Sequence, residues 1–282
     1  MTFHKHPYFN ISRSTSMAML VFFFVFSQMS TAAPANKPLI FWVISNEANT
    51  TAIDHTPWQS LLDCYLISNH PSEINRFNYE AVSKADQKKL HDYISNMQNL
   101  DPRSYNRTEQ KAYWINLYNA LTIDLILKNY PVESITKLGE SYFSFGPWDD
   151  KVANIQGKTL SLNNIEHGIL RPLFRDNRIH YAVNCASISC PNLAKDAFTS
   201  ENTDLLLELG AKQYVNHPRG VTFKGSKLEV SSIYHWYKVD FGDSDKTLIA
   251  HLAKYAAPTL SKKLSLYQGN IDHDYDWSLN KP

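Results

Sequence analysis

The chain has 282 residues, of which 43% are hydrophobic and 20% are charged, and its formal net charge at pH 7 is +1. This composition is typical of a globular protein with one sizeable hydrophobic core. Because the net charge is small and no block of like charge occurs, the sequence argues against nucleic acid or an acidic membrane surface as a partner.

The first 32 residues have the pattern of a signal peptide. Lys5 and Arg13 precede an unbroken apolar run, 17–26, and small residues follow it. These three segments in this order are typical of a secretory signal, and Ser30 and Ala32 place the cleavage after Ala32. The run is well short of the ~20 residues that span a bilayer, so we expect no stable membrane span after cleavage. The sequence therefore predicts an exported protein, periplasmic in a Gram-negative source and otherwise extracellular.

The remaining chain, 33–282, shows no repeat or linker and is predicted to form one domain. A short apolar run, 39–44, predicts a strand or a packed N-terminal arm. Thr56 and Pro57 are typical of a helix start, with Thr56 as the N-cap. A second helix is predicted after the capping-box pattern at Ser83. Its spacing predicts one buried face, formed by Leu90, Tyr93, Ile94 and Met97.

The third predicted helix, 108–129, differs from the first two because it is apolar on nearly every side between 112 and 127. A helix without a polar face is buried by its neighbours, so we expect it to be the central helix of the domain. Asn116 and Asn119 lie within it, where an unpaired amide would cost ~1–3 kcal/mol. Both side chains must therefore have partners, in the scaffold or at a site.

The second half of the chain mixes hairpins, a strand and helices. Turn residues at 156–157 and 224–226 predict two β-hairpins, and the alternation from 179 to 185 predicts a strand that ends at Cys185. Helices are predicted at 202–215 and 245–256. The sequence thus predicts a helix-rich single α+β domain with a central buried helix and a small, mainly antiparallel sheet.

The segment from Asn184 to Pro191 is the strongest candidate for chemistry. It places Cys185 at a predicted strand end, in a loop of small residues that also contains Cys190. Backbone N–H groups in such a loop can lower a thiol pKa and hold an oxyanion. A nucleophilic cysteine also needs a base, which is usually histidine. The third cysteine, Cys64, lies in a predicted helix and is interpreted as a bystander.

His167 is the histidine best placed to be that base. Asn163, His167 and Arg171 are spaced four apart and are predicted to form a polar row on one helix face. Arg171 in this row suits a ligand carboxylate. Two alternatives remain open: Asn163 and Glu166 also fit a capping box, and a polar row can simply be solvated.

The other histidines carry weaker signals. His235 is followed by Asp240, a candidate carboxylate partner, but it is predicted to be a surface residue beside packed aromatics. His180 is predicted to form a hydrogen bond inside the fold. A zinc site formed by His167, His180, Cys185 and Cys190 lacks the short paired spacing of zinc ligands. No phosphate-binding or dinucleotide motif occurs, so we expect no cofactor, and no residue is assigned as a metal ligand.

Five motifs carry a family resemblance. They are Trp114–Ala120, Glu166–Pro172, His180–Pro191, Trp236–Phe241 and Tyr275–Asn280. In this order they resemble the family catalogued as domain of unknown function 547, over roughly 106–280. The resemblance implies exported bacterial proteins, and larger proteins of plants and animals, without a settled activity. It implies site positions at Asn116, Asn119, Glu166, His167, Arg171, His180 and Cys185.

Two features of that family bear on Cys185. The residue after the cysteine is usually glycine in the family and is Ala186 here, which disfavours a positive φ or a close ligand approach at this position. Some members lack the second cysteine, which implies a working Cys185 and not a bridge to Cys190.

The leading hypothesis is a cysteine-dependent hydrolase or acyl transferase of the cell envelope, with Cys185 as nucleophile and His167 as base. Residues expected to bind or orient the substrate are Asn116, Asn119, Glu166, Arg171, His180 and Asn184. The rival hypothesis is a non-catalytic binding domain with a structural Cys185–Cys190 disulfide, and a metalloprotein is a third. The expected ligand is a small molecule, a peptide or a glycan, and the sequence does not predict the oligomeric state.

Overall fold

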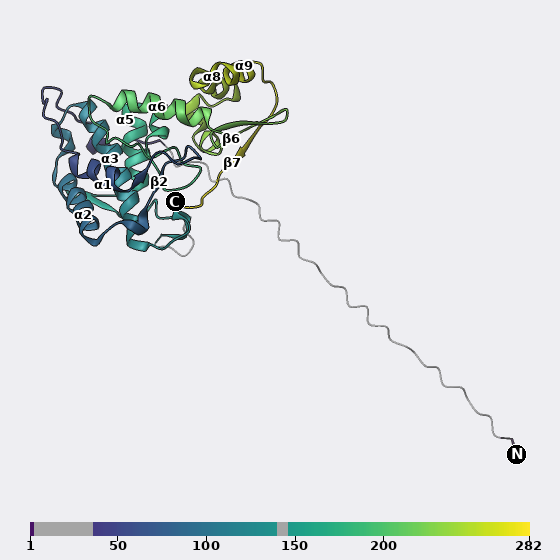
Figure 1. The fold of residues 1–282 in the computed structure, drawn as a ribbon, viewed down its shortest axis with the longest axis horizontal. Coiled ribbons are helices and arrows are strands. Elements are labelled where there is room, and N and C mark those ends of the chain that lie inside the picture. Colours follow the sequence, from purple (N-terminus) through teal and green to yellow (C-terminus); the bar gives the residue numbers. More distant parts are fainter. Residues whose placement is uncertain (3–35, 140–145) are drawn as a thin grey trace. The chain divides into compact units, whose positions relative to one another are not determined.

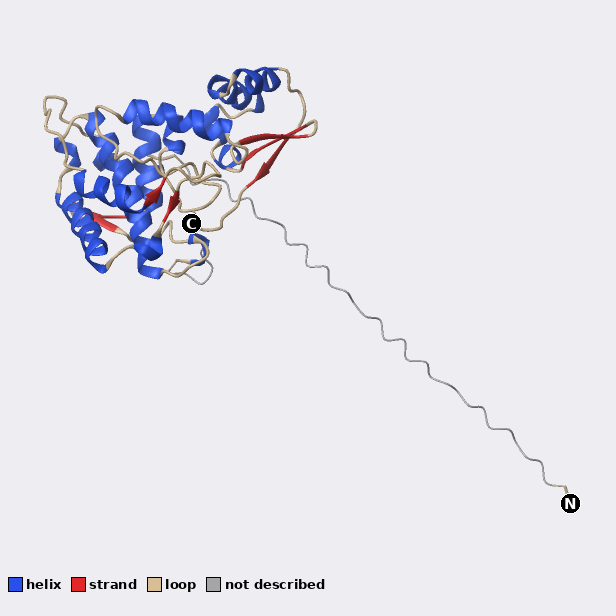
Figure 2. Cartoon of the chain, in the orientation of Figure 1, coloured by secondary structure: helices blue, strands red, loops and turns tan. Residues whose placement is uncertain are grey.

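Helix packing organises the chain from Ala32 to Pro282, which forms one compact unit. The computed structural model describes residues 1–2, 36–139 and 146–282, so the predicted signal peptide lies, from residue 3 on, outside the described residues. Helix predominates in the described parts and the strands are short (Figure 2). The predicted α+β class is confirmed.

The first half of the unit is built on helices α1 (Thr56–Tyr65), α2 (Lys84–Asn99) and α3 (Arg107–Asn129), which pack in chain order (Figure 1). The Ser83 hydroxyl accepts the Asp86 N–H at 3.1 Å and caps α2, as predicted. The N-cap position of α1 is one residue earlier than predicted. His55 occupies the N-cap position and Thr56 is the first helical residue, whose N–H donates to the Asp54 carboxylate at 2.9 Å.

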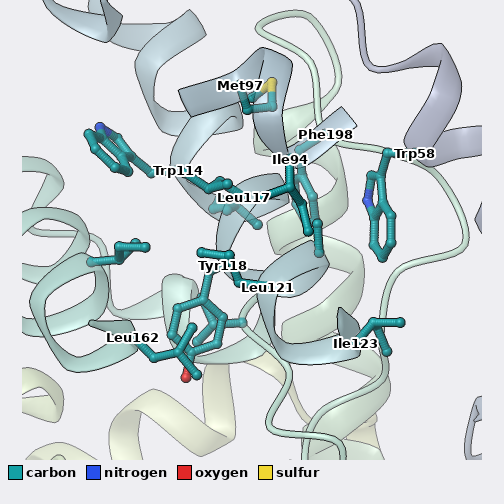
Figure 3. Packing of buried hydrophobic residues seen from close by; sticks show 14 of the residues in the cluster. Trp58, Ile94, Met97, Trp114, Leu117, Tyr118, Leu121, Ile123, Leu162 and Phe198 are labelled. Atoms are coloured by element: carbon teal, nitrogen blue, oxygen red, sulfur yellow. The ribbon is translucent and has the colours of Figure 1, made fainter. Parts of the chain in front are cut away.

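Helix α3 is the central helix, and its buried residues extend along nearly its whole length. Figure 3 shows the packing around it, with Trp114, Leu117, Tyr118 and Leu121 of α3 next to side chains of α2 and of later segments. The predicted apolar face of α2 is also buried. The apolar stretch of the sequence therefore predicted the centre of the fold correctly.

The remaining elements are short strands, which form small sheets, and six further α-helices among the described residues. The strands are β1 (Leu66–Ile67), β2 (Arg76–Phe77), β3 (Ala153–Ile155), β4 (Lys158–Leu160), β5 (Val221–Lys224), β6 (Lys227–Ser231) and β7 (Ile271–Asp274). The helices are α4 (Leu162–Ile165), α5 (Arg171–Phe174), α6 (Thr203–Asn216), α7 (Ile233–Trp236), α8 (Asp245–Tyr255) and α9 (Pro258–Ser265).

Both predicted hairpins form, as β3–β4 and β5–β6. The strands make separate small sheets, and the β5-β6-β7 sheet contains a parallel pair, in which Leu228 of β6 faces Ile271 of β7. This pair is parallel because α8 and α9 intervene and carry the chain back before β7 begins.

The predicted strand from 179 to 185 is wrong. Residues Asn177–Tyr181 form a 3-10 helix, η6, because the Asp176 carboxylate accepts the N–H of Arg178 at 3.0 Å and starts a helical turn. Ile179, His180 and Tyr181 are all buried, although a half-buried strand would expose one of two neighbours. Apolar and polar residues alternate in this segment, but both kinds are buried, so the alternation does not mark a strand with one exposed face.

The apolar run 39–44 is a packed arm and not a strand. It contains a short 3-10 helix, η1 (Ile40–Trp42), and Trp42 packs edge-on against Trp114 of α3 at 5.1 Å. The N–H of Leu39 donates to the carbonyl of Gly168 at 2.8 Å. A Cβ at Gly168 would lie only 2.7 Å from Cγ of Leu39, so the close approach of the arm requires glycine there.

The buried hydrophobic residues form two clusters. The larger one surrounds α3, and the smaller one lies among α6, β5, β6 and α8. The chain passes from the smaller cluster at Tyr181 to the larger one at Ala182, directly before Cys185. None of the helices in the described ranges is sufficiently long and apolar to cross a membrane.

Candidate functional site

The loop that carries Cys185 is held closed by one side chain. The Oδ1 atom of Asn184 accepts the N–H of Ala186 at 2.8 Å, and its Nδ2 donates to the carbonyl of Pro191 at 2.7 Å. The N–H of Asn184 itself donates to Oδ1 of Asn119 at 2.8 Å. Asn184 therefore joins both ends of the loop and fixes the loop to the central helix.

Ala186 adopts the left-handed conformation that the family resemblance associates with glycine. Its φ is +59° and it is fully buried. An alanine there costs roughly 1–2 kcal/mol, which the hydrogen bond to Asn184 and burial must offset. Strain stored next to a half-buried cysteine is typical of a functional site.

The sulfur of Cys185 lies among hydrogen-bond donors. It is 3.2 Å from the Ser187 hydroxyl and 3.1 Å from the Tyr275 hydroxyl, which are themselves 3.1 Å apart. Burial opposes ionisation of the thiol, but hydrogen bonds from Cys190, Ser187 and Tyr275 outweigh burial. The pKa of Cys185 therefore lies below its usual value, which favours the reactive thiolate.

Cys190 is the buried neighbour of Cys185, and both are free thiols. The N–H of Cys185 donates to the Cys190 sulfur at 2.9 Å. Burial, together with the hydrogen bond to Cys185, raises the pKa of Cys190 well above its usual value. The two thiols therefore differ, since the half-buried one ionises more easily and the buried one keeps its proton.

Tyr275, whose hydroxyl contacts the Cys185 sulfur, belongs to a group of half-buried aromatic rings. Tyr275 lies 4.5 Å from Trp277 and 4.9 Å from Trp236 between ring centroids. Trp277 also contacts Trp148 at 5.5 Å. Such rings offer flat apolar faces with polar edges, which suit a planar, peptide or sugar ligand.

The second polar group of the site surrounds the π-helical segment η5 (Glu166–Leu170). The capping box that precedes it is formed by Ser161 and Asn164, not by the predicted pair Asn163 and Glu166. Asn163 instead donates to Asp149 at 2.8 Å and leaves the predicted row. Glu166 takes no part in this capping box and is buried, with its carboxylate 3.3 Å from the Tyr118 hydroxyl and 3.7 Å from Nδ1 of His180. A π-helical turn of this kind often marks a functional site.

Asp240 is the carboxylate of this second group. Its Oδ2 accepts Nε of Arg171 at 2.6 Å and Nε2 of His180 at 2.7 Å. Burial would raise the pKa of Asp240, but these two hydrogen bonds lower it to about 2. His235 is exposed and its ring lies 4.9 Å from that of His273, whereas the Asp240 carboxylate binds Arg171 and His180.

The charge on Arg171 determines which nitrogen of His167 carries the hydrogen. Arg171 donates to Nδ1 of His167 at 3.1 Å, and a guanidinium can only donate. Burial lowers the pKa of His167, with Glu166 opposing and Arg171 adding to the effect. The ring is therefore a neutral imidazole with its hydrogen on Nε2, which makes that atom a donor.

Tyr237 lies next to both polar groups. Its ring stacks on His180 at 4.1 Å and lies 5.8 Å from His167. Burial raises the pKa of Tyr237, and the nearby Glu166 and Cys185 raise it further. Among the described residues, Cys185 and His167 share no hydrogen bond, and Tyr237 is the residue that lies against His167 and is also near enough to Cys185 for its charge to act on the Tyr237 pKa.

The two asparagines of α3 bind backbone. Asn116 donates to the carbonyl of Phe198 at 2.7 Å and accepts its N–H at 3.0 Å. Asn119 donates to the carbonyl of Ala182 at 2.9 Å as well as accepting the N–H of Asn184. Both amides have the partners that burial demands, and Asn119 positions the Cys185 loop.

Arg171 also lines a small cavity of about 190 Å³. Its other lining residues are Asn36, Arg175, Asp176, Asn177 and Asp240. Within the described ranges, the histidines, cysteines and carboxylates form no group of three or more that could hold a metal ion. The sequence did not single out Ser187, Tyr237 or Tyr275, although all three lie in the motifs of the family resemblance.

Fold and site together define a helix-rich α+β protein with a thiol among hydrogen-bond donors. Residues 102–215 match the model of the family described as "Protein of unknown function, DUF547", and the chain resembles that family. The match contains Asn116, His167, Cys185 and Cys190, whereas Asp240 and Tyr275 lie beyond it. No curated protein and no solved structure matches the chain.

Proposed function

We propose that this protein is an exported, thiol-dependent hydrolase or acyl transferase of the cell envelope, with Cys185 as the nucleophile. The observation that carries the proposal is the pair of linked hydroxyls beside the Cys185 sulfur: Ser187 donates to the Tyr275 oxygen at 3.1 Å, and the Tyr275 hydroxyl lies 3.1 Å from the sulfur, to which it can donate. These donors favour the thiolate, which is the nucleophilic form of cysteine.

The same donors suit the charge movement of acyl transfer. When the thiolate attacks an acyl carbon, negative charge moves from sulfur to the acyl oxygen. The Tyr275 hydroxyl, which accepts a hydrogen bond from Ser187, lies beside the sulfur and therefore near an acyl group under attack, where it can donate to the oxygen on which the charge develops. Departure of the leaving group gives an acyl-cysteine, which water or a second nucleophile cleaves.

His167 enters this proposal as a donor. Cys185 ionises without a histidine base, because its hydrogen bonds already favour the thiolate. Arg171 fixes the tautomer of His167 with hydrogen on Nε2, so the ring can donate to a substrate oxygen or a leaving group. The aromatic rings of Trp236, Tyr275 and Trp277 offer contact faces for a small-molecule, peptide or glycan acyl donor.

Intact-mass spectrometry of the protein recovered from producing cells tests the proposal. The Cys64→Ser variant is used throughout, because Cys64 is exposed and would react with acylating reagents by itself. We expect a chain that begins at Ala33 and that gains one acyl group on Cys185 when it is mixed with p-nitrophenyl acetate. Cys64→Ser/Cys185→Ala is the matched control, and equal ester turnover by the two variants would rule out Cys185 as nucleophile.

The binding-domain hypothesis has one observation in its favour. The Cys185 N–H lies 2.9 Å from the Cys190 sulfur, so a disulfide between these residues needs little movement of the loop. A Cys185–Cys190 bridge that persists in an excess of reduced glutathione would support a structural disulfide and the binding domain. A free Cys185 thiol in the isolated protein supports the enzyme.

A further inference from the structure

Hydrogen bonds to the backbone of the Cys185 loop keep Cys185 and Cys190 next to each other. These bonds do not require a disulfide between the two residues. Ile188 donates through its N–H to the carbonyl of Ser278 at 2.8 Å, and Asn280 donates to the carbonyl of Ala186 at 3.0 Å. The hydroxyl of Ser189 accepts the N–H of Asp276 at 2.8 Å. The C-terminal segment thus fixes the loop on its outer side.

The inner side of the loop is fixed as well. Asn184 joins the loop ends, and the hydroxyl of Tyr214 donates to the carbonyl of Ser189 at 2.6 Å. Because the backbone is held on both sides, Cys185 and Cys190 stay next to each other whether they are thiols or a disulfide. Because the disulfide can form and break without refolding of the loop, the pair can cycle between dithiol and disulfide.

The two thiols have the unequal access that stepwise exchange requires. Cys185 is partly exposed, whereas Cys190 is 3% exposed and contacts Cys185. Of this pair, Cys185 is therefore the thiol that a disulfide from solution can reach, and the thiol within reach of the product is Cys190. The difference in exposure therefore means that Cys185 reacts first, with the substrate, and Cys190 reacts second, with Cys185.

The first two backbone N–H groups of the loop are not free for an acyl oxygen, but disulfide exchange needs no such donor. The N–H of Cys185 is bound by the Cys190 sulfur and that of Ala186 by Asn184. Exchange passes through a chain of three sulfurs and requires a thiolate, a second thiol and access. The loop supplies all three.

We propose that Cys185 and Cys190 form a dithiol pair that reduces disulfide substrates. The Cys185 thiolate attacks one sulfur of a substrate R–S–S–R′, forms a mixed disulfide and releases R′–S⁻. Cys190 then loses its proton, attacks the Cys185 sulfur and releases R–S⁻, which leaves a Cys185–Cys190 disulfide. The substrate gains two electrons and the protein loses two, while the protons given up by both cysteines end on the two thiol products.

This activity rests on the same nucleophile as the proposed acyl transfer and extends it. The Cys185–Cys190 disulfide has no thiolate, so oxidation of the pair also switches off acyl transfer. A thiol that reduces the Cys185–Cys190 disulfide restores both disulfide reduction and acyl transfer.

The test uses the full chain as a Cys64→Ser variant, fully reduced and then mixed with oxidised glutathione. Acid-quenched intact-mass spectrometry without reductant should show an internal disulfide and release of both glutathione halves as thiols. Cys64→Ser/Cys190→Ser should stop at a glutathione adduct on Cys185. Cys64→Ser/Cys185→Ser should react slower by about two orders of magnitude, because Cys190 is buried and keeps its proton.

The outcomes separate this inference from acyl transfer. A stable glutathione adduct on the Cys64→Ser protein, with no internal disulfide, overturns the dithiol pair even if the same protein is acylated. An internal disulfide without acylation by p-nitrophenyl acetate supports the pair and rejects acyl transfer. If neither reagent modifies Cys185, both proposals fail. If the Cys190 variant does not fold, the presence or absence of an internal disulfide in the Cys64→Ser protein still tests the dithiol pair.

Discussion

Cys185 shows how much a single residue depends on neighbours that are distant in sequence. The sequence placed it in a loop of small residues, and backbone N–H groups were expected to lower its pKa. Side chains do much of this in the structure, and Tyr275 reaches the sulfur from ninety residues away along the chain. The chemistry of this residue therefore comes from tertiary contacts, because no local pattern encodes them.

Removing the Tyr275 hydroxyl should raise the pKa of Cys185. A hydrogen bond to a charged group contributes ~1.5 kcal/mol, so Tyr275→Phe should lower the thiolate fraction about tenfold at any pH below that pKa. The rate of iodoacetamide alkylation against pH, in the Cys64→Ser background, measures the change.

Tyr267→Phe is the matched control for this prediction. The Tyr267 hydroxyl donates to the carbonyl of Asn270 and contacts no cysteine. Its alkylation profile should match that of the parent. A Tyr275→Phe profile that coincides with the parent would show that this hydroxyl does not support the thiolate.

At the scale of elements, the π-helical segment η5 (Glu166–Leu170) explains why the predicted polar row was only partly correct. Spacing by four assumes a regular α-helix, but a π turn holds five residues where an α turn holds four. His167 and Arg171 still meet, whereas Asn163 turns away and Glu166 turns inward. The departure from the α-helix thus gathers the buried polar group.

Gly168 couples this segment to the N-terminal arm. Alanine in place of glycine gains ~1 kcal/mol in helix propensity, but a methyl group 2.7 Å from Cγ of Leu39 costs about 1–3 kcal/mol. The hydrogen bond from Leu39 to the Gly168 carbonyl keeps the arm from moving away. Gly168→Ala should therefore destabilise the protein by about 1 kcal/mol, measured by urea unfolding.

The matched background is Leu39→Ala, which removes the side-chain atoms that the new methyl group would meet. In that background Gly168→Ala should stabilise the protein by ~0.5–1 kcal/mol, because only the helix propensity remains. The same change in unfolding free energy in both backgrounds would mean that Leu39 does not constrain residue 168.

At the scale of the whole molecule, Asp240 joins segments that lie far apart in sequence. It follows α7, and it binds Arg171 after the π-helical segment and His180 in η6. Arg171 is 3% exposed at its side chain, so its ion pair is buried. Removing one partner of a buried pair costs about 3 kcal/mol, and we expect Asp240→Asn to lose this much at pH 5.

The pKa of Asp240 gives this effect a pH dependence. Because it falls from 3.8 to about 2 on folding, the carboxylate stabilises the fold above its unfolded pKa and loses this effect as pH falls toward 2. The difference in unfolding free energy between wild type and Asp240→Asn should narrow by about 1 kcal/mol from pH 5 to pH 3. Urea unfolding at both pH values measures it.

Asp245→Asn is the control, since the Asp245 carboxylate pairs with Lys238 at the surface. Exposed pairs contribute ~0–1 kcal/mol, so this variant should stay close to wild type at both pH values. A gap for Asp240→Asn that stays constant or widens toward pH 3 would contradict the assigned direction of the pKa shift.

The sequence by itself determined the features that depend on local pattern. The capping residue Ser83, the hairpin turns and the apolar stretch of α3 specify hydrogen bonds and burial within a few residues of themselves. The two asparagines of α3 also had to find partners, because burying an unpaired amide is costly. From these features the α+β class, the central helix and the segment around Cys185 followed.

Tertiary structure alone decided which groups meet. Tyr275 reaches Cys185, Asp240 pairs with Arg171 and His180, and the predicted strand before Cys185 forms a 3-10 turn. Most of these contacts join residues that are far apart in the sequence, and the spacing of residues along the chain does not predict which distant residues come together. The fold brings the second thiol and the donors to Cys185, and so determines the chemistry that we propose for it.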